Sequence, residues 1–580
     1  MPSAGVFCGR SCAAGIGNLL AVLAMLCAWT PWAEAQISIP GAIEPLPGPG
    51  ETRPELPEFR EPPPELQVPP RQRPPRLSTS PVLFLRNVRF EGNTAFSDEV
   101  LRSVAAPYIG REVSSDDLQE LRYALSEYYI EHGYINSGAI LPDQDVVDGT
   151  VTYRIVEGRL SEILVTGAEG LQESYITDRL RLGVGVPLDI EQLRERIQIL
   201  LQDPLIDRLN AELRPGLQPG DSVLDRAVTR ARPFELRASF DNDVSPSIGE
   251  FRGRISGVAR NLTGWGDAVD LLIGRTSGLD EISGGVAMPL NRYDTTVDLR
   301  FEINNAEVVE EELDAFNIRS RQRSVEIGVR QPVYRTPRDQ FDLGLTLARR
   351  HSQTTLNGEP FPFSPGEENG EANVTVLRFS QSWTSRDVDQ VIAARSTFSL
   401  GLGWFGATNN PGSEPDSQFL AWLGQVQWAR RFGEAGPQII FRTDLQLASD
   451  DLLSMERIAI GGFETVRGYR KNTLVRDNGV ISSLEGRIPM IRLPVPGLSR
   501  QAEDGMVQLA PFFDYGRGWD KHEVTDAPNE IYSVGVGLRW ELTPDILAQV
   551  YYGHALRDLD QPSGGLQNSG VFMSVTARLY

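Results

Sequence analysis

Apolar and polar residues alternate with a period of two along most of the C-terminal part of this sequence. In residues 532–542 the apolar side of the alternation consists of Tyr532, Val534, Val536, Leu538, Trp540 and Leu542. Because successive side chains of a β-strand point to opposite faces, such a segment has one apolar face and one polar face. Residues 233–580 contain sixteen segments of this kind and no stretch with helical periodicity. The pattern therefore restricts this part of the chain to antiparallel β-structure.

A closed membrane barrel and a soluble β-sandwich could both be built from such strands. The predicted strands span about 10–13 residues, whereas strands of globular proteins usually span about 5–6 residues. Aromatic residues gather near the strand ends, as they do in the girdles of outer-membrane barrels, and an even strand number is typical of these barrels. Closure also removes the exposed edges of the sheet. The sequence thus predicts a β-rich membrane protein with a 16-stranded antiparallel transmembrane β-barrel over residues 233–580.

The first 35 residues have the features of a signal peptide. Arg10 supplies a positive charge, residues 13–29 form an apolar run, and Ala33-Glu34-Ala35 is a small-x-small cleavage site. An uncleaved membrane anchor is the alternative, but small residues interrupt the apolar run. All three cysteines lie in this segment, so we expect a mature chain without disulfides. Residues 36–81 follow as a proline-rich linker, because proline fixes φ and lacks an N–H group.

Residues 82–232 combine strands with amphipathic helices and contain an internal repeat. The apolar stripes of one helix in each copy correspond at an offset of 72 residues: Leu118, Leu121 and Leu125 in the first copy, and Ile190, Leu193 and Ile197 in the second. Ser115 and Asp189 occupy the expected N-cap positions of these helices. Each copy is predicted to have the order β-α-α-β-β, over residues 82–158 and residues 159–232.

Two short motifs fall at related places in the predicted barrel. A long loop, residues 452–471, joins the eleventh and twelfth strands and contains Val466-Arg467-Gly468-Tyr469, and the thirteenth strand contains Phe512-Phe513-Asp514-Tyr515-Gly516. Strand parity places Phe513 on the lipid face and Asp514 in the lumen. A carboxylate with little water around it needs a cationic partner, and Arg467 could supply a bidentate guanidinium from a loop folded inward. The residues alone leave open an exposed loop arginine and a solvated pore aspartate.

Taken together, these features resemble the two-partner secretion transporters of the outer membrane. The resemblance is to the TpsB type, the ShlB/FhaC/HecB-like haemolysin secretion/activation proteins, in the superfamily that also contains BamA. It covers residues 82–580 and rests on the two β-α-α-β-β modules, the sixteen strands and the two motifs at their places in the barrel. Each motif alone is weak, and their combination is specific.

This resemblance implies a mechanism as well as a fold. The two modules would be POTRA domains that capture an unfolded, secreted TpsA-like partner of the adhesin or haemolysin type in the periplasm. The partner would then cross the barrel, whose lumen loop is held by pairing of Arg467 with Asp514. Outer-membrane lipid and the barrel assembly machinery are the other expected partners. The family's C-terminal aromatic assembly signal corresponds to Tyr580, although Tyr580 is out of phase with the apolar face of the last strand.

Other classes of protein fit the sequence less well. A net charge of -22 argues against a nucleic-acid partner. No nucleotide-binding loop of the Gly-x-x-x-x-Gly-Lys-[Ser/Thr] type is present, and the four histidines are not spaced as metal or triad residues. We therefore expect no enzyme activity, cofactor, metal or nucleotide. The alternatives are a BamA- or TamA-type assembly factor, a plain porin and an outer-membrane enzyme.

Overall fold

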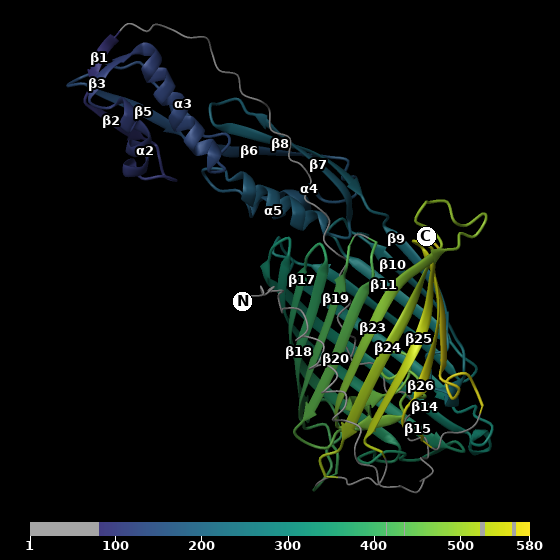
Figure 1. The fold of residues 1–580 in the computed structure, drawn as a ribbon. Coiled ribbons are helices and arrows are strands. Elements are labelled where there is room, and N and C mark those ends of the chain that lie inside the picture. The colour runs from purple at the N-terminus through teal and green to yellow at the C-terminus, as the bar shows by residue number, and fades with distance from the viewer. Residues whose placement is uncertain (1–80, 413, 434, 523–527, 560–563) are drawn as a thin grey trace, which may run out of the picture.

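The computed structural model describes residues 81–412, 414–433, 435–522, 528–559 and 564–580. Two α+β units lie one after the other at one end of a large β-barrel, as Figure 1 shows. The expected signal peptide and nearly all of the expected proline-rich linker fall outside the described residues.

The first α+β unit is built around a three-stranded sheet with two helices. Its elements are β2 (Asn87–Glu91), α2 (Asp98–Ala105), α3 (Ser115–Glu131), β4 (Gly138–Ile140) and β5 (Thr150–Val156). Strand β5 is central, and it runs parallel to β2 and antiparallel to β4. A separate pair, β1 (Pro81–Leu85) with β3 (Arg111–Ser114), accompanies this sheet. Leucines of the helices pack against Tyr153 of β5 in one buried core.

The start of α3 differs by one residue from the sequence-based prediction. Ser114, not Ser115, is the N-cap, because its hydroxyl accepts a hydrogen bond from the Asp117 N–H and the Asp117 carboxylate accepts one from the Ser114 N–H. This reciprocal arrangement is a capping box, with an aspartate at the third helical position. The second prediction of this kind is confirmed, since the Asp189 side chain caps α5.

The second unit repeats the topology of the first. It comprises β6 (Arg159–Thr166), α4 (Glu173–Arg181), α5 (Ile190–Leu201), β7 (Ile206–Pro215) and β8 (Asp221–Arg230). The central strand β8 runs parallel to β6 and antiparallel to β7, which matches the strand directions of the first sheet. The apolar residues predicted for the helix stripe, including Leu193 and Ile197, lie in the core of this unit.

The C-terminal part is a closed antiparallel barrel of sixteen strands, as predicted, in which β27 pairs with β9. A two-residue strand, β16 (Glu359–Pro360), adds only to the end of β15. The barrel strands are β9 (Phe234–Asp241), β10 (Arg252–Arg260), β11 (Ala268–Arg275), β12 (Leu279–Pro289), β13 (Thr296–Glu307), β14 (Ile318–Arg335), β15 (Asp339–Leu356), β17 (Glu371–Arg386), β18 (Gln390–Leu402), β19 (Leu420–Arg431), β20 (Gln438–Ala448), β23 (Asn478–Arg492), β24 (Met506–Trp519), β25 (Glu530–Thr543), β26 (Ile546–Ala555) and β27 (Val571–Arg578).

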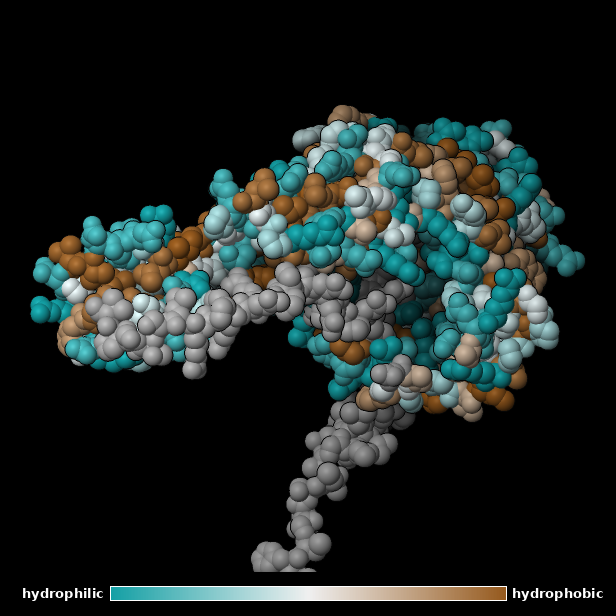
Figure 2. Space-filling model, turned by 90° about the horizontal axis from the view of Figure 1, so that it is seen from above, coloured by the Kyte–Doolittle hydropathy of each residue, from teal (hydrophilic) through white to brown (hydrophobic). Residues whose placement is uncertain are grey.

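Strand β14 shows how the alternation divides the two faces of the barrel. Val325 and Ile327 point outward and are about half exposed, whereas Gln322, Ser324 and Glu326 point inward and are buried. The wall is therefore apolar outside and polar inside, as in barrels that cross a membrane. Figure 2 looks onto the barrel from the end where the α+β units lie, and hydrophilic residues surround the hollow there. Among the described residues, no helix has the length and apolar character needed to cross a membrane.

Candidate functional site in the barrel lumen

The connection between β20 and β23 folds back into the barrel. It spans residues 449–477 and contains the short 3₁₀ helix η4 (Ser454–Glu456) and a hairpin of β21 (Ile458–Ile460) with β22 (Leu474–Arg476). Ile460, Val466 and Tyr469 of this lumen loop are buried and pack against Ile481 and Ile531 of the wall. The loop is therefore a packed element inside the barrel.

Arg467 is the polar centre of the contact between the lumen loop and the wall. Its Nε and Nη2 atoms donate to the two carboxylate oxygens of Asp514 at 2.8 and 2.9 Å, and its backbone N–H donates to the same carboxylate at 3.0 Å. Arg467 is 5% exposed and Asp514 is fully buried. A bidentate guanidinium–carboxylate pair of this kind is both strong and geometrically specific.

The other partners of Arg467 are not apparent from the sequence. Nη1 of Arg467 donates to Glu485 of β23 at 2.6 Å, and Nη2 donates to the Ser483 hydroxyl at 3.2 Å. Glu485 also accepts from Nε of Arg487 at 2.8 Å. Two guanidiniums and two carboxylates thus form a neutral group, which reduces the cost of burying each charge. The Phe512 ring lies 3.6 Å from the Arg467 guanidinium carbon, close enough for a cation–π interaction.

Both glycines of the two motifs stand where there is no room for a side chain. A Cβ on Gly516 would lie 2.3 Å from Cγ2 of Ile460 and 2.9 Å from Cγ2 of Val466. Gly468 has a φ of +96°, and a Cβ there would lie 3.0 Å from the backbone of Gly553. These contacts allow the loop backbone to approach the wall closely.

The remaining motif residues divide between the lumen and the outside. The Tyr469 hydroxyl contacts the backbone carbonyls of Tyr532 and Arg557 at 3.1 and 2.9 Å, so it ties the loop to a further part of the wall. Phe513 points outward from β24 and is 39% exposed, as strand parity indicated. Tyr580 lies beyond the end of β27, where its carbonyl accepts from the Leu236 N–H of β9.

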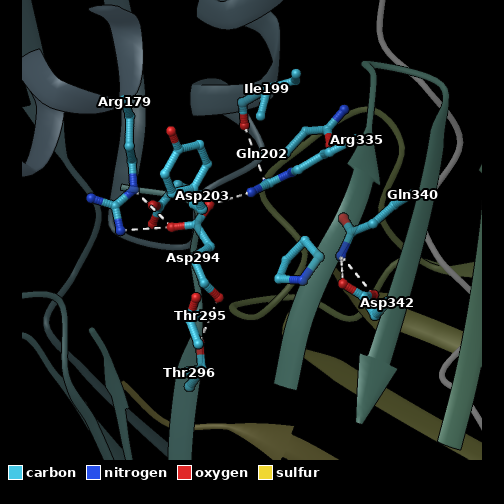
Figure 3. Close-up of polar contacts among 12 residues, drawn as sticks. Arg179, Ile199, Gln202, Asp203, Asp294, Thr295, Thr296, Arg335, Gln340 and Asp342 are labelled. Carbon is cyan, nitrogen blue, oxygen red and sulfur yellow. Dashed lines mark hydrogen bonds and ion pairs between the residues drawn. The ribbon is translucent and has the colours of Figure 1, made fainter. Parts of the chain in front are cut away.

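A second polar contact joins the second α+β unit to the barrel (Figure 3). Asp294, in the turn between β12 and β13, accepts from Arg179 of α4 at 2.6 Å and from Arg335 of β14 at 2.7 Å. The Arg179 guanidinium lies 3.6 Å from the centre of the Tyr175 ring. Asp294 has a φ of 60°, a conformation that aspartate tolerates better than most residues.

Hydrogen bonds to backbone carbonyls strengthen this contact. The Gln172 N–H donates to the Gly264 carbonyl, and the Asn261 side chain donates to the Gly170 carbonyl, both at 2.9 Å. The Gln202 amide, just past α5, donates to the Pro337 carbonyl at 2.8 Å. Three turns at this end of the barrel therefore hold the second unit, and we refer to these contacts together as the joint.

Comparison with known proteins agrees with this architecture. Residues 220–540 match the family described as haemolysin secretion/activation protein ShlB/FhaC/HecB, and residues 83–158 match the ShlB-type POTRA domain. The outer membrane transporter CdiB of Dickeya dadantii is 23% identical, over 72% of this chain and 74% of its own. The heme/hemopexin transporter protein HuxB of Haemophilus influenzae is 24% identical, over 76% of this chain and 77% of its own.

Solved structures show the same fold. CdiB from Escherichia coli has a TM-score of 0.64 and 21% identity, with 87% of this chain and 93% of that chain covered. BamA from Haemophilus ducreyi without its first three POTRA domains is more distant, with a TM-score of 0.52 and 12% identity, over 86% of this chain and all of that chain. Because the family match covers more than half of the sequence, this chain belongs to the haemolysin secretion/activation protein family (ShlB/FhaC/HecB), the outer-membrane translocators of two-partner secretion.

Proposed function

We propose that this chain captures an unfolded secreted partner in the periplasm and passes it through the barrel after the lumen loop has moved. The observation that carries this proposal is the combination of a packed loop in the lumen with a limited set of polar contacts to the wall. Arg467 and Asp514 hold the loop at β24, and Glu485 retains Arg487 as a partner when Arg467 leaves. The wall therefore keeps part of its charge compensation when the loop is displaced.

The two α+β units act, in this proposal, as two POTRA domains over residues 82–158 and 159–232. Their common strand order supports this assignment. In the described part of the chain, β7 pairs only with β8 and thus offers a free sheet edge. An unfolded chain can add to such an edge as a further strand, with affinity supplied by backbone hydrogen bonds. The joint would then hold this edge at a fixed place beside the barrel mouth.

The partner is proposed to be a large secreted protein of the haemolysin or adhesin type, in line with the description of the family. Its folding outside the cell would make export irreversible without a nucleotide. We propose further that the chain has no catalytic activity of its own. Membrane lipid would surround the outward apolar face, and the barrel assembly machinery would insert the chain, with Tyr580 as part of the signal.

Deletion of residues 82–232 tests this proposal directly. We expect one large protein to disappear from the culture supernatant, while heat-modifiable gel mobility shows that the barrel still inserts. A control with Asp280→Asn, in an exposed ion pair on β12, should secrete normally. If the supernatant is unchanged and many outer-membrane proteins decrease together, the chain is an assembly factor of the BamA or TamA type.

A further inference from the structure

The lumen loop has a second charged contact with the wall, distant from Arg467. The 3₁₀ helix η4 ends at Glu456, whose carboxylate lies between Arg350 of β15 and Arg378 of β17. Three strands, β18, β19 and β20, separate this part of the wall from β23, where Arg467 contacts Glu485. The loop thus makes charged contacts with two separate regions of the barrel wall.

The geometry around Glu456 is that of a buried, multiply bonded ion cluster. Nη1 of Arg350 donates to Glu456 at 2.9 Å and to the Met455 carbonyl at 2.6 Å. Nη2 of Arg378 donates to both carboxylate oxygens, at 2.9 and 2.7 Å. The Glu456 carbonyl accepts from the Gln446 amide at 2.9 Å. Glu456 is 7% exposed and Arg350 is fully buried, so water screens these charges weakly.

Apolar packing holds η4 in the same place. Leu452, Leu453 and Met455 are almost fully buried, and they form one cluster with wall residues that include Val374 and Val376 of β17. This cluster and the ion cluster fix the segment that begins the loop. The contact of Arg467 fixes a different position, further along the loop. Loss of either contact therefore leaves one part of the loop unattached.

We propose that Glu456 is a second positioning residue for transport, and that the loop leaves the lumen only when the contacts of both Glu456 and Arg467 are broken. This inference rests on the proposed role of the loop as the part that moves. The wall holds further carboxylates near Arg350: Glu302 of β13 and Arg350 flank Ser324 of β14 in the strand register, and the Ser324 hydroxyl donates to Glu326 at 3.2 Å. These carboxylates stay in the wall after Glu456 withdraws, which lowers the cost of separating Glu456 from the arginines.

The first test is the conductance of the purified full-length protein in planar lipid bilayers. Glu456→Gln and Arg467→Gln should each raise the fraction of time in the open state about tenfold, and the double variant should raise it well beyond either, since each removes one partner of a buried ion pair. Glu307→Gln is the matched control, because Glu307 of β13 pairs with Arg319 of β14 in an exposed ion pair that does not involve the lumen loop. It should conduct like the unmodified protein.

A second measurement follows η4 itself. Leu453→Cys places a thiol at a fully buried position next to the cluster, and its labelling by a membrane-impermeant maleimide on intact cells reports displacement of η4. Labelling should be slow with Glu456 present and at least several-fold faster with Glu456→Gln. Heat-modifiable mobility of every variant verifies that the barrel is folded.

The proposal is wrong if Glu456→Gln conducts and labels as the Glu307→Gln control does. It is equally wrong if the double variant behaves like Arg467→Gln alone. Neither measurement needs the secreted partner, so they test the attachment of the loop separately from transport. If Glu456→Gln opens the channel but secretion never depends on loop movement, the attachment stands and the proposed transport mechanism fails.

Discussion

Arg467 and Asp514 lie 47 residues apart in the sequence, yet three hydrogen bonds from one residue converge on one carboxylate in the barrel lumen. Two of these come from the planar guanidinium and the third from the backbone. The pair therefore depends on the shape of arginine as well as on its charge.

Replacement of Arg467 by lysine should consequently reduce partner secretion nearly as much as replacement by alanine. Lysine keeps the charge but cannot bridge both oxygens of Asp514 and reach Glu485. We expect Arg467→Lys, Arg467→Ala and Asp514→Ala each to reduce partner secretion severely. The double alanine variant should be little worse than either single variant, with a coupling of about 1–3 kcal/mol in barrel stability. If the losses of stability of the two single alanine variants simply add in the double variant in a denaturant titration, the two residues act separately.

Gly516 gives a test of steric fit in the same contact. Gly516→Ala should push the lumen loop away from β24, because its Cβ would meet Ile460 at 2.3 Å; overpacking of this kind costs about 1–3 kcal/mol. Gly486→Ala on β23 is the matched control, since its Cβ would meet only Pro511 at 3.8 Å. Conductance should rise for the first variant and stay unchanged for the second. Equal conductance of the two variants would contradict the tight fit seen here.

Asp294 should set the orientation of the second α+β unit. Asp294→Asn removes the charge that joins Arg179 to Arg335 and should weaken the joint by about 1–3 kcal/mol, since the site is only partly buried. Spin labels at Leu164→Cys and Val388→Cys, both exposed, should then give a broader distance distribution. Asp280→Asn, at the opposite end of β12, should leave the distribution narrow. An equally narrow distribution for both variants would mean that the other contacts of the joint fix the unit without Asp294.

The capping box of α3 predicts a dependence on pH. Hydrogen bonds from the Ser114 hydroxyl and backbone, helped by Arg111, lower the pKa of Asp117 to about 2. Because the pKa is lower in the folded state, Asp117 contributes stability above its unfolded pKa of about 4, and this contribution disappears as the pH falls from about 4 to about 2. Amide hydrogen exchange at the start of α3 should accelerate over that range. In Asp117→Asn, exchange should already be fast at neutral pH, and a pH response that persists in this variant would assign the effect to another group.

The barrel strands could be predicted well from the sequence because the alternation of apolar and polar residues is a local pattern. Alternation assigns each side chain to one face, so the inward position of Asp514 and the outward position of Phe513 followed from parity alone. The sixteen strands were predicted for the same reason. The position of the α3 N-cap was wrong by one residue, because Ser114 and Ser115 are both capable caps and only the backbone geometry selects Ser114.

The partners of the lumen loop could not be predicted in this way. Glu485, Arg350 and Arg378 look like other inward-facing charged residues of the wall, such as Glu302 or Asp444. Their selection depends on where a loop of irregular structure places Arg467 and Glu456 in three dimensions. The hairpin of β21 with β22 has strands of three residues each, which is too short for a periodic signal.

The joint at Asp294 also has a mechanical consequence. Only residues 231–233 connect β8 to β9, and the α4–α5 side of the same unit is bonded to three barrel turns. The second unit therefore cannot rotate freely about residues 231–233 when a force pulls on the free edge of β7. The unit instead transmits such a load to the barrel as a torque, which acts on the turns that hold it, including the turn between β12 and β13.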